Sequence, residues 1–221
     1  AERSGPIVAA LGMAGGTDAL VVDGTEGRSI VTGMDRNAAI WFSPDGFDPE
    51  TKGVNGRRMA GESFLKGWVR HAQVSELVSL CFTGADTARF EQLVRGWGGT
   101  GPVRGVNIDA PNRIAPVGAM FYSAPNFAVE AWRRSRFGAA AWSICGLTHT
   151  ISTRAVMEGF FDLRSAPSQP WDAVICTSRA VQAAVHFQLD LVDDYLTRRF
   201  GGSLPPRFQT PIVPLGIDRD D

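Results

Sequence analysis

From residue 38 onward, short apolar runs alternate with longer segments whose apolar residues recur every three or four positions. Short apolar runs bounded by turn residues are typical of buried strands, and the wider spacing is typical of amphipathic helices. The runs predict strands at residues 38–42, 77–82, 103–108, 118–122, 140–147, 172–176 and 211–214. The spaced segments predict helices at residues 57–72, 86–97, 126–137, 154–163 and 179–200.

Two of these helices have well-defined apolar stripes that we expect to face a core. In the segment 57–72 the stripe consists of Met59, Phe64, Leu65, Trp68, Val69 and Ala72. In the segment 179–200 it consists of Val181, Ala184, Val185, Leu191, Val192, Tyr195 and Leu196. Thr177 and Ser178 are suited to cap the longer helix, and the glycine pair at 201–202 is suited to end it.

Repeated strand–helix units with continuously apolar strands predict a Rossmann-like α/β fold, a parallel sheet with helices on both faces. Ligands of such sheets bind beyond the carboxyl ends of the strands. We therefore expect the chemistry in the loops at residues 43–55, 83–85, 109–116, 123–125, 148–153 and 177–178. This domain is predicted to span residues 38–216. The glycine-rich residues 1–37 fit either a small hairpin or a linker from a preceding domain.

The composition of the 221 residues is that of an ordinary globular protein, with 44% hydrophobic and 20% charged residues. A net charge of -1 provides no field that would favour nucleic acid, so none is expected as a partner. The cysteines Cys81, Cys145 and Cys176 each lie in an apolar run, which indicates reduced, buried thiols in a cytoplasmic protein. No secretory signal or membrane span is predicted. The chain lacks an initiating methionine, so we expect it to be part of a longer protein.

Several common nucleotide and hydrolase motifs are absent from the sequence. There is no G-x-G-x-x-G after the first strand, no G-x-x-x-x-G-K-[ST] and no G-x-S-x-G. Their absence argues against a nicotinamide-dinucleotide fold, a P-loop enzyme and an α/β-hydrolase. His71, His149 and His186 form no recognisable metal-binding motif with one another or with the cysteines, so no metal site is predicted.

The first candidate site is the segment 52–58, Lys-Gly-Val-Asn-Gly-Arg-Arg, at the start of the first predicted helix. Glycines beside a helix N-terminus leave backbone N–H groups available to an anion, and two arginines add phosphate-matching donors. The alternative is a plain turn in which Gly53 and Gly56 only supply left-handed backbone angles.

The second candidate is His149, in the loop Thr148-His149-Thr150 that follows a predicted strand. At the carboxyl edge of the sheet its imidazole could bind a substrate hydroxyl or transfer a proton. The alternative is a loop histidine whose nitrogens are satisfied by nearby backbone. By contrast, His186 falls on the polar side of its helix and His71 at a helix C-terminus, where it complements the dipole.

The third motif is Pro214-Leu215-Gly216-Ile217-Asp218, a bend after the last predicted strand. On its own it could be a domain exit or an ordinary tail. Together with the glycine segment, the histidine loop 146–150 and the segment Trp171 to Ser178, it resembles the N-terminal domain of retaining GT-B glycosyltransferases. The family is the group 1, or family 4-like, class. The resemblance covers residues 38–218.

The resemblance implies the N-terminal half of a GT-B fold, which contributes acceptor binding to hexosyl transfer from a nucleotide-sugar co-substrate with retention. Residues 217–221 would then begin the linker to a C-terminal GT-B domain that carries the Glu-x7-Glu signature. No metal or other cofactor is implied. His149 would be the catalytic residue that meets the transferred sugar. The substrate- and donor-binding residues would be Gly53, Asn55, Gly56, Arg57, Thr148, Thr150 and Ser178.

Two other functions remain compatible with the sequence. The chain could belong to a non-catalytic sugar- or nucleotide-binding module of the same fold, or to a sugar-nucleotide epimerase of the same shape. The identity of the acceptor is not encoded in these motifs, and a peripheral contact with a membrane is also compatible with them.

Overall fold

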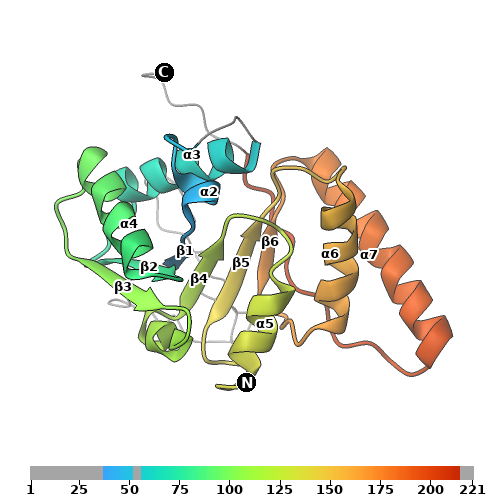
Figure 1. The fold of residues 1–221 in the computed structure, drawn as a ribbon. Coiled ribbons are helices and arrows are strands. Elements are labelled where there is room, and N and C mark those ends of the chain that lie inside the picture. Colours follow the sequence, from blue (N-terminus) through green and yellow to red (C-terminus); the bar gives the residue numbers. More distant parts are fainter. Residues whose placement is uncertain (1–36, 52–55, 215–221) are drawn as a thin grey trace, which may run out of the picture.

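A computed structural model of the chain describes residues 37–51 and 56–214. Its centre is a six-stranded sheet in the order β3-β2-β1-β4-β5-β6 (Figure 1). Every neighbouring pair of strands is parallel. The strands are β1 (Ala39–Trp41), β2 (Leu77–Cys81), β3 (Val103–Asn107), β4 (Ala119–Tyr122), β5 (Ser143–Leu147) and β6 (Ala173–Ile175). The predicted Rossmann-like α/β fold is therefore confirmed.

Helices cover both faces of the sheet, as Figure 1 shows. One face packs against α3 (Gly56–His71) and α4 (Gly84–Gly96), with the short helix α2 (Pro44–Phe47) beside α3. The other face packs against the 3-10 helix η1 (Pro111–Val117), α5 (Ala128–Ser135), α6 (Arg154–Ser165) and α7 (Arg179–Phe200). Side chains of the strands alternate between the two cores because successive residues of a strand point to opposite faces.

Local sequence determines where several helices begin and end. Thr83 and Asp86 form a reciprocal capping box at the start of α4. The Ser178 hydroxyl accepts a hydrogen bond from the Val181 amide and so caps α7. Gly201, with φ of 72°, ends α7, as the glycine pair predicted.

A buried ion pair fixes the amino edge of the sheet. Arg134 of α5 and Asp172, which precedes β6, are both fully buried and lie 2.5 Å apart. Asp172 also accepts hydrogen bonds from the amides of Ile144 and Gln169. The guanidinium further donates to the carbonyls of Trp142 and Pro167. One charged pair thereby links α5 to the amino ends of β5 and β6.

The predicted last strand, 211–214, is wrong. Gln209 and Ile212 make only isolated parallel bridges, to Ala173 and Cys176, so the segment follows β6 without forming a regular strand. Pro211 and Pro214 have no N–H to donate, which leaves too few hydrogen bonds for a continuous ladder. The loop predicted at 109–116 likewise contains η1.

The predicted inward stripes are also wrong in part. Met59 of α3 and both Leu191 and Tyr195 of α7 are exposed by half or more. On α7 the prediction was right for Val185 and Leu196, which are buried, and it missed the buried Leu189. Helical spacing locates apolar residues on a helix, but it does not show how wide a stripe the sheet covers.

The predicted hairpin or linker at residues 1–37 lies outside the described residues, except for Asn37. The same holds for residues 215–221, which include most of the predicted domain exit. Among the described helices, none has the length and apolar character needed to cross a bilayer.

Candidate functional site

The order of the strands defines a switch point between β1 and β4. The chain leaves β1 toward α2 and α3 on one face, and it leaves β4 toward α5 on the other (Figure 1). Ligands of doubly wound sheets bind beyond the carboxyl ends of the strands at such a point. The loops after β1, β4 and β5 therefore carry the strongest candidates.

The loop after β1 is held in place by two arginines. Arg89 of α4 forms a fork with Asp48, with distances of 2.7 and 2.8 Å to its two carboxylate oxygens. This fork and the Glu50 amide lower the pKa of Asp48 against the effect of burial. The buried Arg58 donates to the carbonyls of Thr51 and Asp45. Residues 45–51, after β1, are thus anchored to α3 and α4.

These contacts correct the idea that both arginines of the glycine segment are free for phosphate. Arg58 is 5% exposed and its guanidinium bonds the loop, so it acts as a scaffold. Arg57 is half-buried and pairs with the half-exposed Asp45. A pair this accessible costs little to rearrange, so Arg57 can still turn toward an anion.

The glycine segment itself is only partly described. Gly53 and Asn55 lie outside the described residues. Gly56 is the first residue of α3, is exposed, and has open space where a side chain would be. The N-terminus of α3 therefore opens at the carboxyl edge of the sheet.

His149 lies two residues after β5, at the same edge of the sheet. Its ring is half-buried, and its Nδ1 atom is buried without a hydrogen-bond partner of ordinary geometry among the described residues. Burial and the positive charge of Arg57 lower the pKa of His149, while the Leu147 backbone acts in the opposite direction. The imidazole is therefore neutral near pH 7 and can both donate and accept a hydrogen bond.

Arg57 also acts on Tyr122, the last residue of β4. Burial raises the pKa of Tyr122, the negative charge of Glu130 adds to this, and the charge of Arg57 opposes it. Arg57 is thus electrostatically coupled to side chains that follow both β4 and β5. The start of α3 follows β1 and the histidine loop follows β5, so both lie at the carboxyl edge of the parallel sheet.

Three other predicted residues are occupied by local structure. The Thr148 hydroxyl is buried and donates to the carbonyl of Ile175 at 2.8 Å. Thr150 shares a hydrogen bond with Ser152, and Ser178 caps α7. Thr148 therefore fixes β5 to β6 and is not accessible to a substrate, whereas Thr150 and Ser178 remain partly exposed.

Sequence reasoning missed a second set of side chains at the switch point. Trp41 ends β1 and its ring packs edge-on against Tyr122 at 4.8 Å and Phe82 at 5.5 Å. Its indole N–H donates to the buried carboxylate of Glu130. Burial raises the pKa of Glu130, and the nearby Arg133 opposes this. The sequence alone did not indicate that Glu130, in a predicted helix, would be buried.

No cluster of three or more potential metal ligands occurs within residues 37–51 and 56–214. The three cysteines are buried free thiols, as predicted. Burial raises the pKa of Cys176 to about 11, so this thiol is unreactive at neutral pH.

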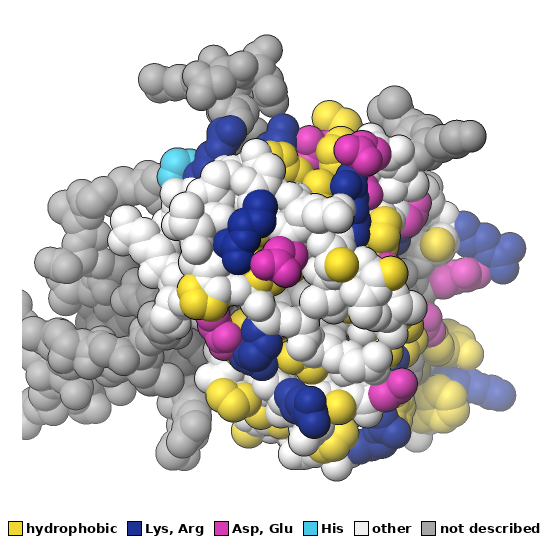
Figure 2. All heavy atoms as spheres, turned by 60° about the vertical axis from the view of Figure 1, so that its left-hand side comes forward, with side chains coloured by type: hydrophobic (Ala, Val, Ile, Leu, Met, Phe, Trp, Pro, Cys, Tyr) yellow, Lys and Arg dark blue, Asp and Glu magenta, His cyan; other side chains and the backbone are white. Residues whose placement is uncertain are grey.

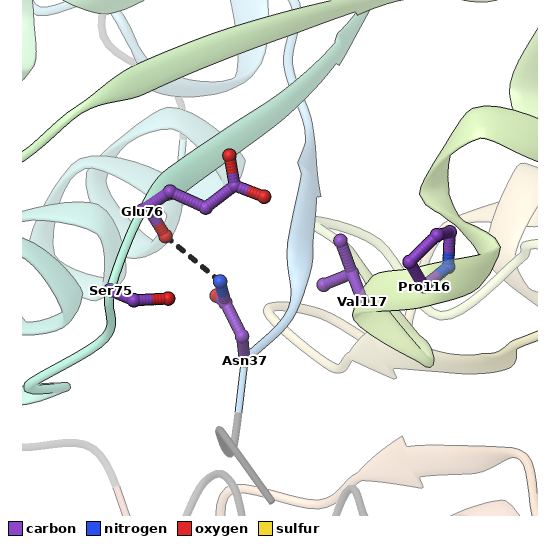
Figure 3. Close-up of a pocket in the computed structure, with 5 residues that line it drawn as sticks. All are labelled: Asn37, Ser75, Glu76, Pro116 and Val117. Atoms are coloured by element: carbon purple, nitrogen blue, oxygen red, sulfur yellow. Dashed lines mark hydrogen bonds between the residues drawn. The ribbon is translucent and has the colours of Figure 1, made fainter.

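A pocket among the described residues lies away from the carboxyl edge of the sheet. It is lined by Asn37, Ser75, Glu76, Pro116 and Val117 and lies at the opposite, amino edge (Figure 3). The Glu76 carboxylate there is held by Arg104 at 2.6 Å and serves structure. On the face that Figure 2 shows, acidic and basic side chains are interspersed, with no broad patch of one sign.

Comparisons of the chain with models of protein families, with curated proteins and with solved structures found no match. The functional assignment therefore depends on the site itself.

Proposed function

We propose that this chain is the acceptor-side, N-terminal half of a cytoplasmic GT-B glycosyltransferase that transfers a hexosyl group with retention. The observation that carries the proposal is that Arg57, in the first turn of α3, and the half-buried His149, after β5, both lie at the carboxyl edge of the sheet. A neutral hydrogen-bonding imidazole beside a cation suits a ligand that combines sugar hydroxyls with phosphate.

In this reaction the bond between the sugar and the donor's diphosphate breaks, and a bond forms from the same sugar carbon to the acceptor oxygen. The acceptor proton passes to the leaving phosphate. His149 would hold a hydroxyl of the transferred sugar, and Arg57 with the backbone N–H groups at the N-terminus of α3 would face the diphosphate. No divalent metal is needed, because cationic groups can balance the leaving diphosphate.

The proposal requires a partner domain. The nucleotide-sugar would bind mainly to a C-terminal GT-B domain, and the linker to it would begin at residues 217–221. The described half supplies a rigid edge, because Arg58 and Arg89 anchor the loop after β1. Rigid support of this kind orients reacting groups and lowers the entropic cost of transfer.

Product analysis tests the proposal. The full-length protein is incubated with a panel of nucleotide-sugars and carbohydrate acceptors, and the products are resolved by NMR. A new glycoside with the anomeric configuration of the donor is the expected result. An epimerised nucleotide-sugar would identify an epimerase, and unchanged donor with measurable binding would identify a non-catalytic module. Either result would refute the proposal.

A further inference from the structure

Three aromatic rings cluster at the switch point: two of them are partly buried against the core, and the third is exposed. Trp41 ends β1, Phe82 follows β2 and Tyr122 ends β4, so the three rings stand at the carboxyl ends of adjacent strands. Trp41 contacts both other rings edge-on, and Phe82 remains 49% exposed. Large aromatic rings left exposed at the ligand-binding edge of a sheet commonly serve recognition.

Hydrogen bonds and an ion pair hold this cluster in place from three sides. Glu130 of α5 accepts a hydrogen bond from the Trp41 indole at 3.2 Å and pairs with Arg133 at 3.1 Å. Arg133 in turn donates to the carbonyl of Ile108, after β3. The Asn107 amide donates to the carbonyl of Phe82. The α5 helix and the loops after β2 and β3 are thereby tied together around the indole.

One polar group of the cluster is left for a ligand. The Tyr122 hydroxyl makes no hydrogen bond to any described residue, and its oxygen is not fully buried. Burial and the negative charge of Glu130 raise the pKa of Tyr122, and Arg57 opposes this, so the phenol is an uncharged donor and acceptor at neutral pH. A purely apolar ligand would strip water from the hydroxyl without replacing its hydrogen bonds. The combination fits a neutral ring with an apolar face and hydroxyl groups.

We infer that the aromatic cluster Trp41–Phe82–Tyr122 binds the acceptor, and that the acceptor presents a neutral carbohydrate ring to it. The ring stacks on Phe82, and one of its hydroxyls bonds the Tyr122 hydroxyl. Glu130 is a positioning residue that orients Trp41. The acceptor role rests on the proposed glycosyl transfer, whereas binding of a carbohydrate ring to the cluster does not.

Ligand-observed NMR on the chain tests this inference directly. The probes are the methyl glycosides of glucose, galactose and mannose, with cyclohexanol as a ring that carries a single hydroxyl. We expect saturation transfer to at least one glycoside and a weaker signal for cyclohexanol. Phe82→Ala should weaken binding of that glycoside at least about tenfold. Tyr122→Phe, which keeps the ring, should weaken it by about three- to tenfold.

Phe200→Ala is the matched control, since Phe200 is 74% exposed at the end of α7, far along the chain from the cluster. It should leave the affinity unchanged. Binding of no glycoside, binding that survives Phe82→Ala, or equal binding of cyclohexanol would each overturn the inference. The full-length protein could bind a glycoside in a way that depends on Phe82 and yet transfer no sugar. That result would refute the proposed function but support the carbohydrate site.

Discussion

Replacing Asp172 by asparagine removes one charge from a fully buried ion pair while preserving the shape of the side chain. The two Asp172 oxygens accept two hydrogen bonds from Arg134, at 2.5 and 2.8 Å, and one each from the amides of Ile144 and Gln169. An asparagine has one acceptor oxygen, so its NH2 group must face a donor. The guanidinium of Arg134 then lacks a counter-charge in the core.

Leaving one member of a buried ion pair without its partner costs about 3–5 kcal/mol of unfolding free energy. This is a large part of the roughly 5–15 kcal/mol that stabilises a typical domain. With a urea m-value of about 2–3 kcal/mol/M for a domain of this size, the midpoint should fall by about 1–2.5 M. The assay is urea unfolding followed by circular dichroism, with the m-value required to stay constant.

Asp194→Asn is the matched control. Asp194 pairs with Arg198 one turn away on the exposed side of α7, and such pairs contribute at most about 0.5 kcal/mol. Its midpoint should therefore stay close to that of the parent chain. A loss below about 1 kcal/mol for Asp172→Asn would refute the claim that this pair fixes the amino edge of the sheet.

Three further predictions concern the carboxyl edge and its supports. Arg57→Gln should raise the pKa of His149 but leave it below the ordinary value of 6.5, because burial lowers this pKa more than the charge of Arg57 does. An NMR titration of the ring that shows no rise would contradict the electrostatic effect of Arg57. Asp48→Asn should lower the free energy of unfolding by about 1.5–3 kcal/mol at pH 7. Because the pKa of Asp48 is lowered, this difference in urea stability should shrink as the pH falls below 3.8, and a constant difference would exclude the Arg89 fork as its source. Gly61→Ala places a methyl group 2.1 Å from the Gly46 carbonyl oxygen, where α3 packs on α2. It should lower the free energy of unfolding by about 1–3 kcal/mol, measured by thermal unfolding. Gly56→Ala is the control, because its methyl group meets open space and should not lower the stability.

The sheet could be predicted from sequence because its signal is local and repeated. Each apolar run between turn residues became a strand, except at 211–214, where two prolines interrupt hydrogen bonding. The limits of α7 were predicted to the residue, because Ser178 and the glycine pair mark its ends. Burial on α7 was harder to predict, since Leu191 and Tyr195 continue the apolar pattern beyond what the sheet covers.

The site was only partly predictable for a related reason. Position after a strand placed Gly56 and His149 at one edge of a parallel sheet, and no knowledge of side-chain contacts was needed for that. Thr148 bonds a carbonyl on the neighbouring strand β6, and Arg58 bonds a carbonyl in the loop after β1. The spacing of residues along the sequence does not reveal such contacts. The Trp41–Glu130 contact joins residues 89 positions apart, so it emerges only when β1 and β4 pair.

The central claim is that His149 takes part in sugar transfer, and the turnover of a nucleotide-sugar by the full-length protein tests it most directly. We predict that His149→Ala lowers this turnover by about a hundredfold or more. His186→Ala is the control, because His186 is exposed and hydrogen-bonds Thr210 at the far end of the chain, and it should leave turnover unchanged. Turnover that is the same in the His149→Ala protein as in the parent would contradict the account.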